Sequence, residues 1–355
     1  MTVRVAIMGT GWGTRIQVPG FRQAGLEVTA LWARTDEKAA QAAADLGIPF
    51  SSTDPLAVIG RDDVDLVSIV TPPDTHAAWS MAALQAGKHV LCEKPTALNR
   101  AEAEAMLRAA QSHPQQVAVI DHELRFLPTR ARMRALIAEG YVGEVTHMDG
   151  VMLAGSRLDA NRAWNWWSSA EQGGGVLGAI GSHYTDMLRW LSGREVQAVS
   201  GELRTVVTER PGPDGAPLAV TSDDWAAGVL DFGDGIRATL LLSVVTAGRG
   251  VSVLRVAGTK GTLVYKNEKL TGYRAGQSDG EDLTVAEDFT PPTGNDGAEW
   301  MRGTVYIGQA LKQAIETGDF SALAAAATFA DGLKIQQVLD AWRESAQGRA
   351  WVTVS

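Results

Sequence analysis

Short apolar runs alternate with segments of helical pattern through the first third of the chain. The runs have the length and bounds of buried strands, and they are Val3–Met8, Glu27–Ala33, Leu66–Val70, His89–Cys92 and Gln116–Ile120. The segments with helical pattern are Asp36–Leu46, His76–Ala86 and Arg100–Ser112. Strand and helix in steady alternation predict a doubly wound parallel sheet with right-handed crossovers, so the fold class is α/β.

The pattern changes after residue 123, where strands begin to follow one another directly. The expected strands are Glu144–Leu153, Val196–Thr205, Trp225–Phe232, Ile236–Val245, Ser252–Ala257, Thr262–Lys266 and a short Trp351–Val354. The expected helices are Phe126–Glu139, Gly181–Leu191, Gly297–Thr317 and Ser321–Ser345. Asp234-Gly235 is a strong signal for a tight hairpin, and successive hairpins predict a large, mostly antiparallel open sheet. We therefore expect two domains, residues 1–123 and 124–355.

The expected second sheet has a face without helical cover, because no helix is predicted between Val196 and Lys266. An uncovered apolar face needs a partner. We expect a homodimer or homotetramer that assembles through this sheet.

Composition narrows the functional class. The chain has 355 residues, 45% hydrophobic and 21% charged, with a net charge of −9, which is typical of a globular protein too long for one ordinary core. No block of lysine or arginine stands out, so neither nucleic acid nor a membrane surface is an expected partner. The single cysteine, Cys92, excludes a disulfide framework and zinc-ribbon metal sites. We see no signal peptide and no membrane-spanning run, so we expect a cytoplasmic protein with no metal.

A glycine-rich loop follows the first predicted strand. It reads Gly9-Thr10-Gly11-Trp12-Gly13-Thr14, between a strand and a helix-like segment. Such a loop brings backbone N–H groups and a helix N-terminus close to a pyrophosphate. The full dinucleotide-binding pattern has a third glycine where Thr14 stands, and Gly13 comes one position early. We predict that residues 9–13 bind a nicotinamide dinucleotide.

The next two strand ends add candidate cofactor contacts. The second strand is followed by Arg34, where NAD sites carry an acid and NADP sites an arginine for the 2′-phosphate. Arg34 therefore favours NADP over NAD, although it can also stack on adenine or lie idle on the surface. Thr71 and Pro72 close the third strand at the same sheet edge. His76, just beyond, either lines the nicotinamide pocket or starts the next helix.

The fourth strand ends in Glu93-Lys94-Pro95. Open α/β sheets bind ligands at the carboxyl ends of their strands. A lysine that is partly buried there has a lowered pKa and serves as a proton donor or acceptor. We take Lys94 as the catalytic candidate and Glu93 as a cofactor contact; the alternative is a solvated charge before a turn.

The runs VDLVSIVTPPDTH and ALQAGKHVLCEKP resemble the glucose-fructose oxidoreductase, inositol dehydrogenase and rhizopine-catabolism (Gfo/Idh/MocA) family. The resemblance continues through Arg125–Pro128 and LIAEGYVGEV, then through Gly173–Gly175 with His183, and through Val256–Thr262. It implies a two-domain NAD(P)-dependent oxidoreductase of sugars, cyclitols or related hydroxy and keto compounds. It also implies that Lys94 binds a substrate hydroxyl and relays its proton, that the Lys94–Pro95 bond is cis, and that His183 faces the same substrate carbon.

The chain departs from the family pattern at Ala179, where an acid four residues before His183 is expected. We interpret this as a changed substrate contact, with Asp186 as a partial replacement or a structural residue. Upstream, Arg162 and Trp164 stand near the family's Trp-Arg position and are substrate-binding candidates; interdomain packing is the alternative for the tryptophans.

Two other functions remain open. One is an NAD-dependent glycosidase of the same fold, and the other is a non-catalytic NAD(P)-binding regulatory protein.

Overall fold

A computed structural model describes residues 2–292 and 298–355 and divides them into two compact units. Unit 1 comprises residues 1–97, 101–127 and 287–333, and unit 2 comprises residues 98–100, 128–286 and 334–355. Gly297, the first residue of one predicted helix, lies outside the described residues. The sequence predicted a continuous second domain, 124–355, and this is wrong for residues 287–333. The reason is that the helix at 298–317 packs on α1 (Val18–Gln23) of the first unit rather than on the second sheet.

Unit 1 is built on a seven-stranded sheet in the order β17-β6-β5-β4-β1-β2-β3. Its parallel strands are β1 (Arg4–Met8), β2 (Glu27–Trp32), β3 (Phe50–Ser52), β4 (Leu66–Ile69), β5 (His89–Cys92) and β6 (Ala118–Ile120). β17 (Ala327–Thr328) pairs antiparallel with β6. The predicted doubly wound parallel sheet is confirmed, with β3 and β17 as strands that the hydrophobic pattern did not reveal.

Most helices of unit 1 lie between successive strands of its sheet. The helices of this unit are η1 (Gly13–Gln17), α1 (Val18–Gln23), α2 (Asp36–Leu46), α3 (Pro55–Ile59), η2 (Pro73–Thr75), α4 (His76–Gln85), α5 (Arg100–Ser112), η3 (Glu123–Phe126), α8 (Ala298–Thr317) and η6 (Phe320–Leu323). Arg100, the first residue of α5, is assigned to unit 2 together with residues 98–99 that precede it. β1 alternates its side chains between two apolar clusters, with Val5 and Ile7 in one and Ala6 and Met8 in the other. The sheet is thus buried on both faces, which is why its strands are almost wholly apolar.

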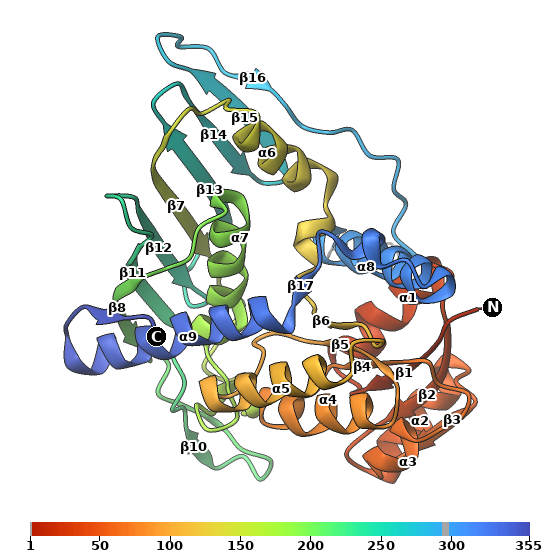
Figure 1. Cartoon of the computed structure of the whole chain (residues 1–355). Helices are drawn as coiled ribbons and strands as arrows, with labels where there is room; N and C mark the ends of the chain where they lie inside the picture. Colours follow the sequence, from red (N-terminus) through yellow and green to blue (C-terminus); the bar gives the residue numbers. More distant parts are fainter. Residues whose placement is uncertain (1, 293–297) are drawn as a thin grey trace. The chain divides into compact units, whose positions relative to one another are not determined.

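Unit 2 is built on a nine-stranded sheet in the order β16-β15-β14-β13-β7-β12-β11-β8-β18 (Figure 1). The strands are β7 (Val145–Leu153), β8 (Ala198–Arg204), β11 (Trp225–Asp231), β12 (Arg237–Ser243), β13 (Val251–Gly258), β14 (Gly261–Lys266), β15 (Lys269–Arg274), β16 (Glu281–Asp282) and β18 (Val352–Thr353). Only the β7–β12 pair is parallel. The predicted mostly antiparallel open sheet is confirmed. A separate hairpin joins β9 (Glu209–Pro211) to β10 (Pro217–Ala219).

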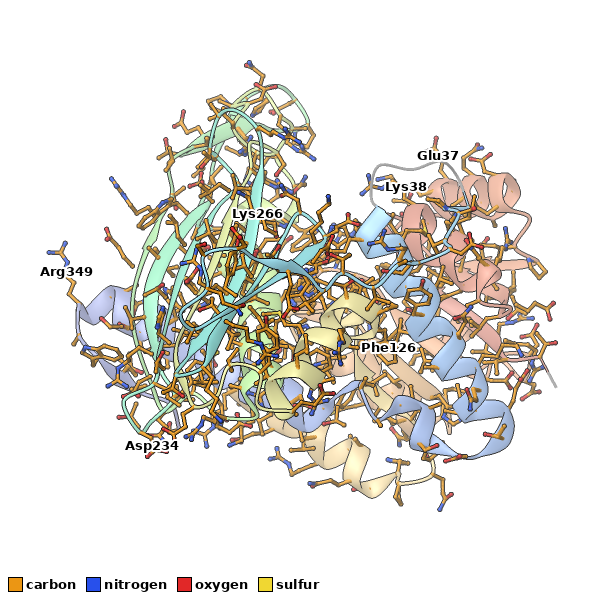
Figure 2. The ribbon with its side chains drawn as sticks, turned by 90° about the horizontal axis from the view of Figure 1, so that it is seen from above. Glu37, Lys38, Phe126, Asp234, Lys266 and Arg349 are labelled. Carbon is orange, nitrogen blue, oxygen red and sulfur yellow. The ribbon has the colours of Figure 1, made fainter. Side chains whose placement is uncertain are left out.

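The turn between β11 and β12 follows the sequence signal. Asp234 and Gly235 both have positive φ, 51° and 79°, as a tight turn between twisted strands demands. Figure 2 shows Asp234 at the tip of this turn. The register that follows pairs Asp231 with Arg237.

Helices of unit 2 pack on one face of its sheet (Figure 1). Those that the figure labels are α6 (Pro128–Ala138), α7 (Ser182–Ser192) and α9 (Phe329–Gly348), whose first five residues belong to unit 1. The short η4 (Trp166–Ser168) and η5 (Leu177–Gly181) also belong to unit 2. The ring of Tyr184 in α7 packs against Gly150 of β7, and the ring of Trp342 in α9 packs against Gly201 and Gly228. A Cβ at any of the three would overlap these rings. Small residues therefore bring the helices close to the sheet.

Candidate functional site

The glycine loop lies at the carboxyl end of β1 in unit 1. Gly9 has φ of +137°, and a Cβ there would lie 2.6 Å from the carbonyl oxygen of Val70. A Cβ on Gly13 would lie 2.7 Å from Ile7 Cγ2, so this glycine permits close packing of helix on strand. A Cβ on Gly11 would meet nothing within 4 Å. The loop has the backbone form of a phosphate-binding turn, with Gly11 open to a ligand.

Thr14 stands where the usual pattern has its third glycine. Its hydroxyl donates to the carbonyl oxygen of Thr10 at 2.5 Å, and Gly13 takes over the close-packing role. Trp12 holds the loop from the other side, since its ring lies edge-on against Trp300 of α8 with centroids 6.3 Å apart. The helix that follows the loop begins with a π-helical turn, η1, of which Gly13 is the first residue.

Arg34 is exposed just beyond β2. Burial raises the pKa of the Asp74 carboxyl group, and the positive charge of nearby Arg34 opposes this rise. Asp36, the nearest acid after β2, has one carboxylate oxygen that accepts a hydrogen bond from the Thr53 hydroxyl at 3.0 Å. Arg34 is therefore an exposed positive charge close to the end of this strand.

The segment after β4 is fixed by His76. Its Nδ1 lies 2.9 Å from the carbonyl oxygen of Pro95 and its Nε2 lies 2.9 Å from that of Thr71. The ring is fully buried, and burial lowers its pKa. His76 starts α4, as one of the two alternatives predicted. With no exposed surface it has no face for the nicotinamide pocket, and we correct that expectation: His76 ties the Thr71 turn to the Lys94-Pro95 turn.

Lys94 follows β5 at the same edge as the glycine loop and Thr71, and its side chain is half-buried. The Lys94–Pro95 peptide bond is cis, as the resemblance implied. The backbone N–H of Lys94 donates to Glu93 Oε2 at 3.3 Å. Glu93 is 9% exposed, so its carboxyl group points into the protein and supports Lys94 from within.

Buried polar groups beneath Lys94 form a network that sequence reasoning missed. The side-chain amide of Gln17 donates to Glu93 Oε1 at 3.2 Å and to Asp121 Oδ2 at 3.1 Å. Ser68 donates to the Gln17 oxygen at 2.7 Å. We call Gln17, Ser68, Glu93 and Asp121 the carboxyl network. Gln17 lies in η1 and Ser68 in β4, while Glu93 and Asp121 directly follow β5 and β6. No local pattern could have linked them.

Burial is the main cause of raised pKa values for Glu93, Asp121 and the neighbouring Glu123. The negative charges of the group raise the pKa of Asp121 and Glu123 further, and the positive charge of Lys94 opposes the rise at all three. Lys94 therefore stands beside carboxyl groups that hold protons more tightly than exposed acids do.

Unit 2 carries the second group of candidates on a turn and helix. Gly173 and Gly175 have φ of +78° and +112°, a conformation that side chains rarely adopt. The chain then enters η5, and Leu177 N–H donates to Asp223 Oδ2 at 2.7 Å. Burial raises the pKa of Asp223 to about 6. Asp223 thus caps the start of the helical segment that carries His183.

His183 lies in the first turn of α7 and is 4% exposed. Ala179, one helical turn earlier, is half-buried, so no carboxylate stands at the position where the family has one. Asp186 is 1% exposed. Such burial agrees with the structural alternative for Asp186 rather than with a replacement acid.

Arg162 and Trp164 lie in the segment between β7 and η4. Trp164 is fixed by two hydrogen bonds, from its N–H to Pro211 O at 2.8 Å and from its ring nitrogen to Ala219 O at 3.0 Å. Arg162 is exposed and donates to Ser156 O at 2.9 Å. The β9–β10 hairpin therefore holds this segment in place.

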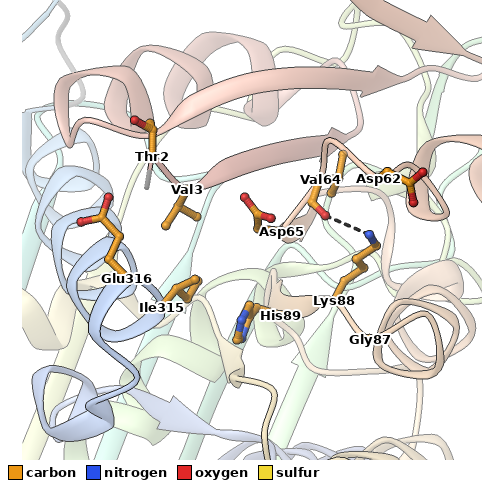
Figure 3. A pocket seen from close by; sticks show the side chains of 10 residues that line it. All are labelled: Thr2, Val3, Asp62, Val64, Asp65, Gly87, Lys88, His89, Ile315 and Glu316. Atoms are coloured by element: carbon orange, nitrogen blue, oxygen red, sulfur yellow. Dashed lines mark hydrogen bonds between the residues drawn. The ribbon is translucent and has the colours of Figure 1, made fainter.

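A hollow at the opposite edge of the unit 1 sheet is a different kind of surface (Figure 3). It is lined by residues that precede strands, among them Val3, Asp65 and Lys88. Lys88 donates to the carbonyl oxygens of Arg61 and Val64. Since dinucleotides bind at the carboxyl ends of the strands, this hollow is separate from the candidate site.

No helix within residues 2–292 and 298–355 is long and apolar enough to cross a membrane. The same residues contain no cluster of three His, Cys, Asp or Glu that could hold a metal ion.

The fold and the glycine loop define a nicotinamide-nucleotide oxidoreductase architecture, and comparison with known proteins agrees. Residues 3–121 match the oxidoreductase family with an NAD-binding Rossmann fold, and residues 131–264 match the GFO/IDH/MocA C-terminal domain. The chain belongs to the Gfo/Idh/MocA family.

Similar proteins cover almost the whole chain. Glucose-fructose oxidoreductase domain-containing protein 2 from Bos taurus is 34% identical over 99% of this chain and 93% of its own length. An oxidoreductase domain protein from Kribbella flavida has a TM-score of 0.89 at 30% identity, covering 100% of this chain and 99% of its own. Levoglucosan dehydrogenase in complex with NADH and levoglucosan has a TM-score of 0.88 at 26% identity, covering 100% of both chains.

Proposed function

We propose that this protein is an NAD(P)-dependent oxidoreductase that transfers a hydride between nicotinamide and a sugar, cyclitol or related hydroxy or keto compound. The observation that carries the proposal is the position of Lys94. It is half-buried at the carboxyl end of β5, in the same parallel sheet whose first strand leads into the glycine loop. A proton-transferring group at the nucleotide edge is what the oxidation of an alcohol requires.

The residues of unit 1 fit a dinucleotide. Gly9 allows the turn, Gly11 leaves room where a pyrophosphate approaches the backbone, and Gly13 allows the helix to start close to the strand. We assign Thr10, Trp12, Thr71 and Pro72 to the same cofactor surface. The nicotinamide cofactor, when bound, supplies the hydride chemistry.

The chain's own task is proton transfer and orientation. In the oxidative direction the substrate hydroxyl gives its proton to the Lys94 amine, and in the reductive direction the Lys94 ammonium returns it. Glu93 and its buried partners hold the lysine in place, and His183 assists or orients the exchange. Arg162 and Trp164 contribute to substrate binding.

For the cofactor we favour NADP, because Arg34 is exposed where a 2′-phosphate is bound in NADP sites. The NADH complex of levoglucosan dehydrogenase keeps NAD as the alternative. That protein's sugar ligand supports a carbohydrate-like substrate here.

A paired assay tests the proposal. The purified protein is incubated with NAD or NADP and a panel of sugars and cyclitols, and reduced nicotinamide is followed by absorbance. Thermal unfolding with each cofactor alone gives an independent measure of binding, because a ligand that binds only the native state raises Tm. We expect substrate-dependent reduction of the cofactor. Cofactor binding with no turnover across the panel would contradict the enzymatic proposal.

One observation favours a second function. Ala179 stands where the family has an acid, and loss of a substrate-binding carboxylate is what a non-catalytic NAD(P)-binding regulatory protein would show. The assay separates the two, since the regulatory protein binds cofactor without turnover. An NAD-dependent glycosidase of the same fold would release sugar with no net gain of reduced cofactor.

We further propose that the protein is a homodimer or homotetramer. Strands of the unit 2 sheet carry side chains such as Val151, Val229 and Leu241 that are only half-buried, on the face opposite the buried Gly150 and Leu230. A second copy would cover this face. Light scattering on a purified sample tests the assembly, and a monodisperse monomer would contradict it.

A further inference from the structure

Three arginines of unit 2 lie close together in or beside the predicted substrate-binding segment between β7 and η4. Arg157 and Arg162 belong to that segment, and Arg210 comes from β9. The Arg157 guanidinium lies over the ring of Trp167, 4.0 Å from its centroid. Arg210 is only 3% exposed. We call Arg157, Arg162 and Arg210 the arginine cluster.

Neutral acceptors hold these arginines in place. Arg210 donates from Nη1 to Asp159 O at 2.7 Å and from Nη2 to Arg157 O at 2.6 Å. Arg162 donates from Nη1 to Ser156 O at 2.9 Å. Carbonyl oxygens fix the geometry of the side chains but carry no net negative charge to pair with the guanidinium groups.

The side chain of Arg157 has a buried nitrogen, Nη1, without a hydrogen-bond acceptor among the described residues. Burial and then the charges of Arg162 and Arg210 lower its pKa to about 10. Since an arginine keeps its proton at neutral pH, three positive charges remain together.

The nearest carboxylates are occupied by backbone groups. Asp224 accepts hydrogen bonds from the N–H groups of Val206 and Val207 at 2.7 and 2.9 Å. Asp159 Oδ1 accepts one from Asn161 N–H at 2.9 Å. Burial lowers the pKa of Arg210, and the negative charges of both acids oppose this decrease only in part. Among the residues that the structure describes, neither acid forms an ion pair with the arginine cluster.

The cluster is connected to the glycine turn. The carbonyl oxygen of Trp167 lies against Gly174, at a position that a Cβ would overlap, and Ser222 donates to the same oxygen at 2.8 Å. The turn leads directly into the helical segment with Ala179 and His183. Because Ala179 stands where the family has an acid, that segment carries one negative charge fewer. This difference favours an anionic ligand.

We propose that the arginine cluster binds the oxyanion of an acidic sugar, either a carboxylate or a phosphate. Arg157 and Arg162 contact the oxyanion, and Arg210 positions Arg157 through its carbonyl oxygen. Planar guanidinium groups suit both oxyanions because they donate paired hydrogen bonds. The inference rests on the proposed function, whose substrate class it narrows from sugars to acidic sugars.

Calorimetric titration measures the binding directly and does not depend on turnover. The intact protein is titrated with D-glucuronate, D-glucose 6-phosphate and D-glucose, which share one ring and differ in charge. We expect the acid that fits to bind at least about tenfold more tightly than glucose, as charge-assisted hydrogen bonds imply. Its affinity falls as ionic strength rises. The two acidic sugars distinguish a carboxylate from a phosphate site.

Matched variants locate the site. Arg162→Gln, an exposed position, should lower affinity for the acidic sugar about tenfold, a larger factor than its effect on glucose binding. Arg157→Lys keeps the charge but loses the planar fork, so a smaller loss is expected. Arg204→Gln, an exposed arginine on β8 of the same unit, is the control and should bind as wild type does.

The outcomes separate the two proposals. Equal affinity for acidic and neutral sugars, or wild-type affinity in Arg162→Gln, overturns the anion site even if glucose is oxidised. Selective binding of an acidic sugar that is never oxidised with either cofactor supports the anion site and contradicts the oxidoreductase.

Discussion

Gln17 and Asp121 are joined by a buried hydrogen bond of 3.1 Å from the glutamine amide to Asp121 Oδ2. They are 104 residues apart in sequence, and the same amide also donates to Glu93. One neutral amide thus serves two buried carboxyl groups beside Lys94. The relationship ties the first helical turn after the glycine loop to the strand end that carries Lys94.

This burial predicts a specific pH dependence of stability. The folded state raises the pKa of Asp121 above its unfolded value, so the native protein binds more protons in the range between the two values. The free energy of unfolding therefore falls as pH rises through that range. Asp121→Asn removes the titration but keeps a polar group of the same size. We expect its stability to fall less steeply between about pH 4, near the unfolded pKa, and pH 8.

Denaturant unfolding at several pH values provides the measurement. Asp62→Asn, an exposed acid in the same unit, is the control and should follow the wild-type curve. A wild-type slope in Asp121→Asn would mean that Asp121 is ionised in the native protein.

The two glycines of the nucleotide loop should respond differently to alanine. Gly9→Ala places a Cβ against the Val70 carbonyl in a conformation with φ of +137°, and such backbone strain costs about 2 kcal/mol or more of stability. Gly11→Ala meets nothing within 4 Å, so its stability should stay close to that of the wild type. Its Cβ should nevertheless obstruct the pyrophosphate. Thermal unfolding with and without cofactor checks both.

Each glycine variant serves as the control for the other. Gly11→Ala should keep its Tm without cofactor and lose most of the increase that cofactor produces. A full cofactor-induced increase in Gly11→Ala would show that the pyrophosphate does not lie against this loop.

Arg34 should determine the preference between the two cofactors. Arg34→Gln removes the exposed charge after β2, and we expect NADP affinity to fall about tenfold while NAD affinity changes little. Lys38→Gln, a neighbouring exposed cation on α2 that Figure 2 labels, controls for a general loss of positive charge. Fluorescence titration with each cofactor gives the ratio of affinities. If Arg34→Gln lowers both affinities equally, the arginine stacks on adenine and does not select the phosphate.

The sequence was sufficient to predict those parts of the fold around the candidate site that one segment encodes. The glycine loop, the Glu93-Lys94-Pro95 strand end and the Gly173–Gly175 turn are each local motifs with a mechanical reason for their residues. The carboxyl network was not predictable, because Gln17 and Asp121 become neighbours only through the order of the sheet. Arg157 and Arg210 are likewise 53 residues apart.

The domain boundary failed for a similar physical reason. α8 has the amphipathic pattern of any packed helix, and nothing in that pattern states which core receives it. In the structure Gly20 of α1 lies against Met301 and Thr304 of α8, so this helix is part of unit 1. Only contacts between distant segments decide such an assignment.

Lys94 provides the decisive test of the proposed chemistry. Lys94→Ala should lower kcat by about a hundredfold to ten-thousandfold, the usual contribution of a general acid or base, while cofactor affinity stays near the wild-type value. Lys94→Arg keeps the positive charge that opposes the raised pKa values of Glu93, Asp121 and Glu123. Arginine does not release its proton at neutral pH, so this variant should restore stability but not turnover. Steady-state kinetics and denaturant unfolding of both variants separate the two roles. Wild-type kcat in Lys94→Ala would rule out the lysine as the proton relay, and restored kcat in Lys94→Arg would reduce its role to charge alone.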